Sequence, residues 1–121
     1  MSYTKVSALF LVGLMILFLA AAPVLGAVSD PERFLRDIGV LVPPRHGVLV
    51  GTLVTLVPSS ERIVVNTNDQ GTVALKLSSS ADLRVMAKTA GPEAFNRGDE
   101  VVIVVDASTK TVKGVYRTTE N

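Results

Sequence analysis

Few residues in this chain could carry out chemistry, and histidine is the first to consider. His46 is the single histidine among 121 residues. A histidine titrates near neutral pH and can serve as a general base. His46 lies between Arg45 and Gly47 in the linker that contains Pro43 and Pro44, and the sequence predicts no nucleophile or second metal ligand beside it. We therefore interpret His46 as a solvated linker residue.

The segment Asn66–Gly71 (NTNDQG) alternates oxygen-bearing side chains in the manner of a calcium-binding loop. Such a loop begins with an acidic ligand and carries a bidentate glutamate at its twelfth position. Here the first position is Asn66 and the twelfth is Leu77. The segment therefore predicts a hairpin turn with Gly71 at positive φ. We expect neither a metal ion nor a cofactor, and the absence of cysteine excludes disulfides, thiolate catalysis and iron–sulfur clusters.

Asp99 and Glu100 are adjacent carboxylates at the start of an apolar run. Neighbouring residues of a strand point to opposite faces, so the two cannot act together as an acid–base pair. Asp99 is expected to bond backbone amides in the turn after Gly98. The serines at 59–60 and 78–80 stand in predicted turns, outside any nucleophile-elbow motif. We predict no catalytic residue and no enzyme activity; a small hydrolase based on His46 or Asp99 is the less favoured alternative.

Charge and aromatic content argue against nucleic-acid binding. Of the 12 basic residues, Lys5 alone precedes residue 28, and all 11 acidic residues follow it, so residues 28–121 carry 11 charges of each sign. A neutral domain has no long-range field to attract a polyanion. Stacking platforms need aromatic side chains, and beyond residue 27 these are Phe34, Phe95 and Tyr116. We therefore expect no nucleic-acid partner.

Residues 1–27 are typical of an export signal. Lys5 supplies a positive start, residues 8–22 are apolar apart from Gly13, Pro23 breaks the run, and Gly26-Ala27 offers a small-residue cleavage site. Cleavage after Ala27 or Gly26 would fit this pattern. The alternative is an uncleaved membrane anchor, because residues 6–28 carry no charge and are long enough to cross roughly 30 Å of bilayer. Both interpretations place the remaining chain outside the cytoplasm.

Residues 28–46 predict one short amphipathic helix and a proline-rich linker. Asp30 can cap a helix over 31–38, Pro31 suits its first position, and Gly39 can end it. Phe34, Leu35 and Ile38 would form its apolar face. We expect this face to pack on the main domain; the alternative is an interfacial helix at the membrane.

From residue 47 onward the pattern changes to short β-strands. Gly51, inside an unusually long first strand, suggests a bulge or bend. We expect residues 79–82 to turn the chain and a helical turn near residue 93 to place Phe95 in the core. In the last strand, alternation predicts Val112, Gly114 and Tyr116 on one face, with residues 113, 115 and 117 on the other. The expected strands are 47–57, 62–67, 72–78, 83–88, 101–105 and 111–118.

Five or six short strands with no long helix between them predict an all-β fold, a small antiparallel closed barrel. Four features carry a resemblance: Gly47-Val48-Leu49-Val50 opening a strand, a second strand with Ile63-Val64-Val65, the hairpin glycine Gly71 before Val73, and the Gly98–Val101 step before the strongest strand. Residues 47–118 resemble the small OB-like β-barrel domains of unknown function found in exported bacterial proteins. The resemblance implies a fold and an extracytoplasmic location, but no reaction.

These observations favour an exported, non-enzymatic binding module of the cell envelope, periplasmic or secreted. Its partner would be a protein, a glycan or another envelope component. The exposed segments 58–62, 90–98 and 106–110 are the expected contacts. The alternative is a structural subunit of an envelope complex, held at the membrane through residues 6–28. We divide the chain into a leader (1–27), the helix and linker (28–46), the barrel (47–118) and a tail (119–121).

Overall fold

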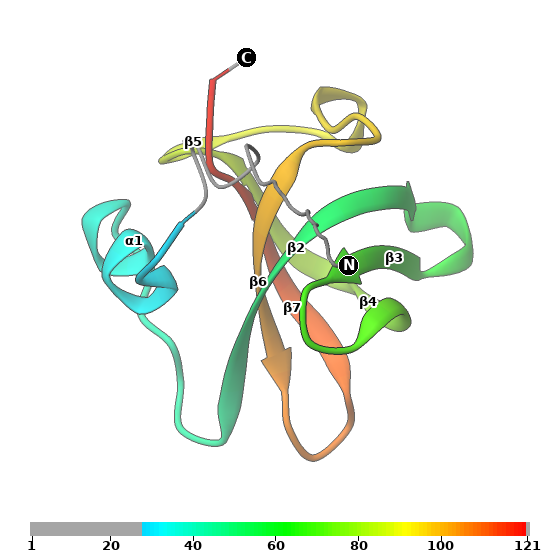
Figure 1. The fold of residues 1–121 in the computed structure, drawn as a ribbon, viewed down its shortest axis with the longest axis horizontal. Helices are drawn as coiled ribbons and strands as arrows, with labels where there is room; N and C mark the ends of the chain where they lie inside the picture. The colour runs from blue at the N-terminus through cyan, green and yellow to red at the C-terminus, as the bar shows by residue number, and fades with distance from the viewer. Residues whose placement is uncertain (1–27, 121) are drawn as a thin grey trace, which may run out of the picture.

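The structure, a computed structural model, describes residues 28–120, so the predicted leader (1–27) and Asn121 lie outside the described residues. None of the helices in residues 28–120 is both long and apolar enough to cross a bilayer. These residues form one α-helix, two 3-10 turns and six strands (Figure 1): α1 (Pro31–Asp37), β2 (His46–Val57), η2 (Pro58–Ser60), β3 (Arg62–Thr67), β4 (Gly71–Val85), β5 (Lys88–Thr89), η3 (Pro92–Ala94), β6 (Glu100–Asp106) and β7 (Thr111–Arg117).

The strands close into a five-stranded barrel. Their order is β3-β2-β6-β7-β4, and pairing of β3 with β4 completes the ring, while β5 extends the sheet beyond β4. The long strand β2 serves two neighbours, because His46–Thr52 pairs with β6 and Thr52–Val57 pairs with β3. The predicted all-β, OB-like barrel with one short helix is therefore confirmed. Closure leaves no long apolar edge on strands as hydrophobic as β2 and β6.

One strand pair differs from the expected antiparallel arrangement. β4 and β7 run parallel, whereas every other pair is antiparallel. Parallel strands need a long crossover connection, commonly a helix. Here the segment 86–99 leads from β4 to β6, β6 runs antiparallel between β2 and β7, and β7 then returns beside β4. The intervening strand β6 takes the place of a crossover helix.

The turn expected at residues 79–82 is wrong. β4 continues from Gly71 to Val85, and its register against β7 jumps from Leu77↔Val112 to Asp82↔Gly114. The strand bulges there without reversing direction, because β7 holds it on both sides of the bulge. The reversal comes later, at Met86 (φ 56°), before β5. The separate strand expected at 83–88 does not form. Residues 83–85 end β4, and β5 begins at Lys88.

Gly51 does not mark the bulge in β2. The register shift against β3 lies between Leu53 and Thr55. A Cβ at Gly51 would lie 3.0 Å from the backbone oxygen of Asn66. Glycine at this position allows β2 and β3 to approach closely where β2 passes from one neighbour to the other.

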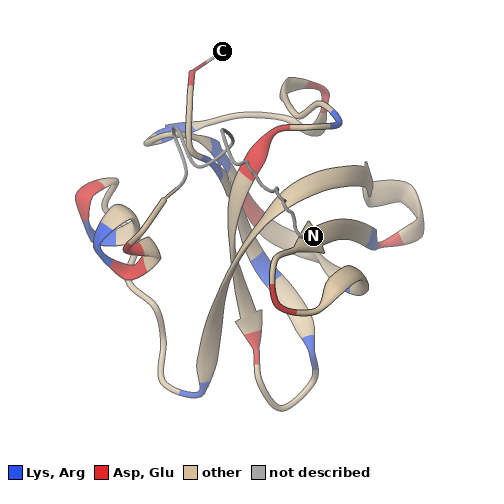
Figure 2. Ribbon diagram, in the orientation of Figure 1, with Lys and Arg blue, Asp and Glu red and all other residues tan. Residues whose placement is uncertain are grey.

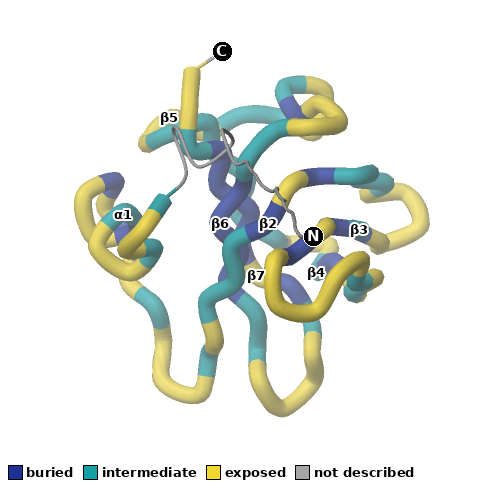
Figure 3. The backbone as a smooth tube through the Cα atoms, in the orientation of Figure 1, coloured by how far each residue is buried: buried dark blue, intermediate teal, exposed yellow. Residues whose placement is uncertain are grey.

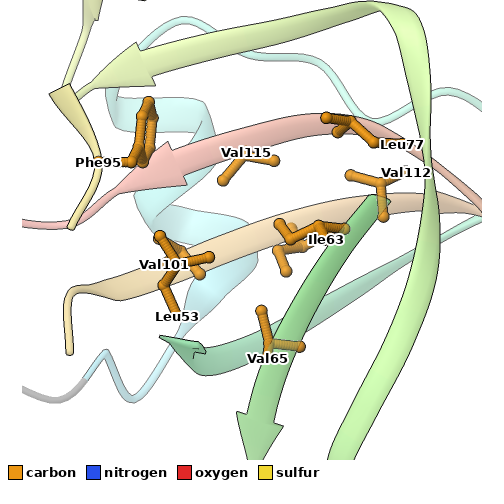
Figure 4. Packing of buried hydrophobic residues seen from close by; sticks show 9 residues of the cluster. Leu53, Ile63, Val65, Leu77, Phe95, Val101, Val112 and Val115 are labelled. Atoms are coloured by element: carbon orange, nitrogen blue, oxygen red, sulfur yellow. The ribbon is translucent and has the colours of Figure 1, made fainter. Parts of the chain in front are cut away.

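The interior of the barrel is a single apolar cluster (Figure 4). Phe95, which η3 directs inward as predicted, is 8% exposed and closes one end of it. Burial of branched aliphatic side chains is the main favourable term for a barrel of this size. The buried members are Leu53, Ile63, Val65, Leu77, Phe95, Val101, Ile103, Val112 and Val115.

The face assignment predicted for the last strand is wrong. Val112 and Val115 both lie in the barrel core, while Tyr116 belongs to a second cluster. Val105 pairs with Val112 but Val104 pairs with Gly114, so Lys113 forms a bulge. One extra residue reverses the alternation after it.

The second cluster consists of residues from α1 and from the barrel strands. Figure 3 shows α1 beside the barrel, with buried stretches in both. Leu35 is fully buried, and it packs with Val102, Val104 and Tyr116. As predicted, the Asp30 side chain caps α1 by accepting from the Arg33 amide at 3.1 Å. The apolar face of α1 thus packs against the barrel.

Candidate functional site

Two adjoining hollows follow the outer side of the barrel where β3 begins, β4 bulges and the β6–β7 hairpin turns. Their volumes are about 330 and 300 Å³, and they share Glu61 and Lys76. We call this surface the β4 groove. Its other polar lining residues are Ser60, Arg62, Ser78, Ser79, Asp106, Thr109, Thr111 and Lys113. Loops at these positions flank the ligand-binding face of OB barrels.

Strand β4, which lines this groove, is not paired with a neighbouring strand along its whole length. β3 pairs with β4 only as far as Arg62↔Lys76. On the other side of β4, pairing with β7 stops at Leu77 and resumes at Asp82. Residues 78–81 therefore have no paired residue in either neighbouring strand. A strand segment of this kind can pair with an added chain.

Three cations border the groove without an anionic partner. Within residues 28–120, the ion pairs are Arg84–Asp82 and Arg117–Asp99, so Arg62, Lys76 and Lys113 have no carboxylate oxygen within 4.0 Å. The acidic lining residues are Glu61 and Asp106. The lining of the groove thus carries three positive and two negative side chains.

Asp106 is committed to its own hairpin. Its Oδ1 accepts from the Ser108 hydroxyl at 2.7 Å, from the Ser108 amide at 2.9 Å and from the Thr109 amide at 3.4 Å. The Ser108 hydroxyl bond is the main reason that the pKa of Asp106 lies below its ordinary value. The carboxylate stays charged and holds the β6–β7 turn. Asp106 Oδ1 is therefore already engaged by donors of its own hairpin.

A second polar cluster, Asp82–Arg84–Tyr116, joins β4, β7 and α1. Arg84 Nε lies 3.0 Å from Asp82 Oδ2, the Tyr116 hydroxyl donates to the same oxygen at 3.0 Å, and Arg84 Nη1 donates to the Ile38 carbonyl at 3.3 Å. Burial first, and then the charge of Asp82, raise the pKa of Tyr116. The phenol therefore remains a hydrogen-bond donor. Through the bond of Arg84 to the Ile38 carbonyl, this cluster holds the end of α1 against the barrel.

His46 begins β2, one residue before the expected strand, and pairs across the ladder with Asp106. Its Nδ1 lies 3.0 Å from the Pro44 carbonyl oxygen. Asp99 directly precedes the opposite end of β6. Seven residues of strand place His46 and Asp99 about 23 Å apart, so they cannot act on one substrate.

Asp99 and Glu100 make separate contacts, as their positions predicted. Asp99 Oδ2 accepts from the Asn96 amide at 2.7 Å and lies 3.5 Å from Arg117 Nε. Glu100 instead accepts from the Thr118 hydroxyl at 2.7 Å. The expected turn-stabilising role of Asp99 is confirmed, and an ion pair with a buried arginine is added to it.

The segment Asn66–Gly71 forms the predicted hairpin. Gly71 has φ 70°, Thr67 Oγ1 donates to the Gly71 carbonyl at 3.1 Å, and the Gln70 amide donates to Thr67 Oγ1 at 3.0 Å. A hollow of about 270 Å³ lies between this hairpin and residues 48–50. In the part of the chain that the structure describes, no three histidine or acidic side chains cluster as metal ligands.

The aromatic rings of residues 28–120 are buried or half-buried. Phe95 and Tyr116 are 8% and 3% exposed, and Phe34 is half-buried against the α1 cluster. Basic and acidic positions alternate over the ribbon without a one-signed stripe (Figure 2).

No family model matches this chain, and no curated protein is similar to it. Solved structures of CusF from Escherichia coli are similar. The Ag(I) form of residues 10–88 is 10% identical, with a TM-score of 0.47 over 61% of this chain and 92% of that one. The apo form of residues 6–88 is 9% identical, with a TM-score of 0.45 over 64% and 94%.

The imidazole and thioether donors of residues 28–120 lie far apart. Soft ions select cysteine and methionine sulfur, with imidazole as a further ligand. The described residues hold one histidine, His46, and one methionine, Met86. His46 pairs with Asp106 at one end of β6, whereas Met86 bonds to Arg117, which pairs with Val101 at the other end. Five residues of strand separate them by about 17 Å, too far for a shared ion.

Sequence reasoning found the groove only in part. The expected contact segments 58–62 and 106–110 do line it, but 90–98 does not. Lys76, Ser78 and Lys113 were missed, because their convergence depends on the parallel β4–β7 pair. The run of three serines inside an alternating strand was the available signal for an irregular backbone.

Proposed function

We propose that this protein is an exported, non-enzymatic binding module whose β4 groove takes an extended acidic peptide segment of an envelope protein. The observation that carries the proposal is the unpaired stretch of β4, residues 78–81, bordered by Lys76 and Lys113. An added strand would gain main-chain hydrogen bonds along this stretch at the groups other than the Ser80 amide, which donates to Ser78 Oγ at 3.2 Å. Its carboxylates would gain the two lysines and Arg62.

Charge supports an acidic peptide over a basic one. Arg62, Lys76 and Lys113 have no ion-pair partner among the described residues, while Asp106 is occupied by Ser108. Glu61 and Asp106 are the two anions of the lining, and the three cations outnumber them. The expected affinity is modest and salt-sensitive, because surface charges are screened within about 8–10 Å at ordinary ionic strength.

Location and activity remain part of the proposal. Export is supported by the leader pattern of residues 1–27. The absence of a reaction is supported by the separation of His46 from Asp99, the two residues on which a hydrolase could be based. The membrane-anchored alternative uses the same domain and differs in whether the leader is retained.

A titration tests the groove. A fluorescent hexapeptide of alternating valine and glutamate is added to the protein, and anisotropy reports binding. Lys76→Gln and Lys113→Gln should each weaken binding about threefold to fivefold. Lys88→Gln, on β5 outside the groove, is the matched control and should leave it unchanged.

Two further peptides separate the contributions. A valine–glutamine peptide should bind more weakly, because the carboxylates are lost. A valine–glutamate peptide methylated at its backbone nitrogens should lose binding, because strand addition needs its N–H groups. Equal binding of all three peptides, or equal affinity of the Lys76, Lys113 and Lys88 variants, would contradict the proposal.

A further inference from the structure

The backbone nitrogen of Val28 is tied to a residue far along the chain. It donates a hydrogen bond of 3.0 Å to Oε2 of Glu100, 72 positions away. The other carboxylate oxygen, Oε1, accepts from Thr118 Oγ1 at 2.7 Å. The Thr118 amide also donates to the Glu100 carbonyl at 3.1 Å. Glu100 thus joins the start of the described chain to the end of β7.

This carboxylate has two neutral donors but no cation. Among residues 28–120, neither a lysine nor an arginine nitrogen lies within 4.0 Å of it. Glu100 is half-buried, so water screens its charge incompletely. A half-buried carboxylate gains from a positive partner more than an exposed one does.

Position 28 is held by its side chain as well. Val28 is half-buried and packs against the cluster formed by α1 and the barrel, whose members include Leu35 and Tyr116. Packing and the backbone bond together fix the Val28 nitrogen beside Glu100.

We propose that Val28 is the first residue of the working protein and that its α-ammonium forms an ion pair with Glu100. Hydrolysis of the Ala27–Val28 peptide bond by a leader-removing peptidase consumes one water molecule. The hydroxyl goes to the Ala27 carbonyl carbon and a hydrogen goes to the Val28 nitrogen. The new amine takes up a proton at neutral pH, because α-amines titrate near pH 7.7–8.0.

The ion pair makes removal of the leader a stabilising event. Before cleavage the nitrogen is a neutral amide, and afterwards the same atom carries a positive charge at hydrogen-bond distance from a carboxylate. The inference rests on the proposed export of the chain. The experiments below distinguish a failure of this inference from a failure of the proposed export.

The first measurement is the N-terminus. The full chain is produced in an exporting bacterium, and the intact mass of the extracytoplasmic product identifies its first residue. We expect Val28. A product that starts elsewhere overturns the inference but leaves export intact, whereas a full-length product inside the cell removes the export proposal too.

The second measurement is the reactivity of the amine. At about pH 6.5 an acylating reagent attacks α-amines in preference to lysines, whose pKa is near 10.4. Only the neutral amine reacts, so the Glu100 carboxylate should slow acylation by roughly threefold to tenfold relative to Glu100→Gln. Glu61→Gln, far from Val28, is the matched control and should react at the wild-type rate. Equal rates in all three proteins overturn the ion pair.

A third measurement covers the case in which Glu100→Gln does not fold. The processed wild-type protein is acylated at its α-amine, which removes the charge and keeps an N–H donor. Its midpoint of unfolding in urea should then fall. An unchanged midpoint overturns the ion pair without any substitution.

Discussion

The ring of Tyr116 lies directly over Gly114, two residues earlier on β7. A Cβ placed on Gly114 would collide with the Tyr116 ring, whose Cε2 and Cζ would both be 2.6 Å away. The same tyrosine reaches past this glycine to donate its hydroxyl to Asp82. Glycine at 114 therefore allows one side chain to cover β7 and to bond β4.

Gly114→Ala should lower the free energy of unfolding by about 1–3 kcal/mol, because the methyl group forces the buried Tyr116 ring out of its position. Urea denaturation measures the loss. Gly47→Ala is the matched control, since a Cβ there meets nothing within 4 Å, and its effect should stay within about 0.5 kcal/mol. Equal stability of the two variants would contradict the role of Gly114.

Alkaline pH should destabilise the protein through Tyr116. The pKa of Tyr116 is raised by burial and by Asp82, so the folded state keeps its proton where the unfolded state loses it. The stabilisation is complete below the unfolded pKa, near 10, and is lost as pH rises above it. Tyr116→Phe removes this slope. The unfolding free energies of wild type and Tyr116→Phe are measured from pH 8 to pH 11. If their difference stays constant over this range, Tyr116 does not cause the loss of stability.

Helix α1 should contribute strongly to stability through one residue. Leu35 is completely buried against the barrel, so Leu35→Ala should cost about 2–5 kcal/mol. Leu41, which is 85% exposed, provides the control. Leu41→Ala should leave the midpoint of thermal unfolding unchanged. A small effect of Leu35→Ala would mean that α1 is dispensable for the barrel.

Asp99 should matter because Arg117 is buried. Arg117 Nε lies 3.5 Å from Asp99 Oδ2 and has no hydrogen-bond partner among the described residues, while Nη1 donates to the Ala94 carbonyl. Asp99→Ala leaves this charge uncompensated and removes the bond to the Asn96 amide, at a cost of roughly 3 kcal/mol. Asp69→Ala, in the exposed β3–β4 hairpin, should change the unfolding free energy little. Comparable losses in the two variants would exclude a special role for the ion pair.

Local patterns were reliable where a single element decided the outcome. The caps of α1, the hairpin at Gly71 and the inward position of Phe95 each depend on a few neighbouring residues, and each was predicted. The errors fell where two strands set each other's register. The bulge at Lys113 is set by the register of β7 against β6, and the bulge at residues 78–81 by the register of β4 against β7. No residue adjacent in sequence indicates these pairings.

The amino-acid sequence by itself determined an all-β barrel with an apolar interior, a capped helix and a balanced charge, because strand periodicity and capping act over a few residues. Tertiary structure alone decided that β4 and β7 run parallel, that Lys76 and Lys113 face one groove, and that Val28 meets Glu100. Each of these relationships joins residues more than 30 positions apart. Barrel closure, which is a property of all the strands together, fixes them.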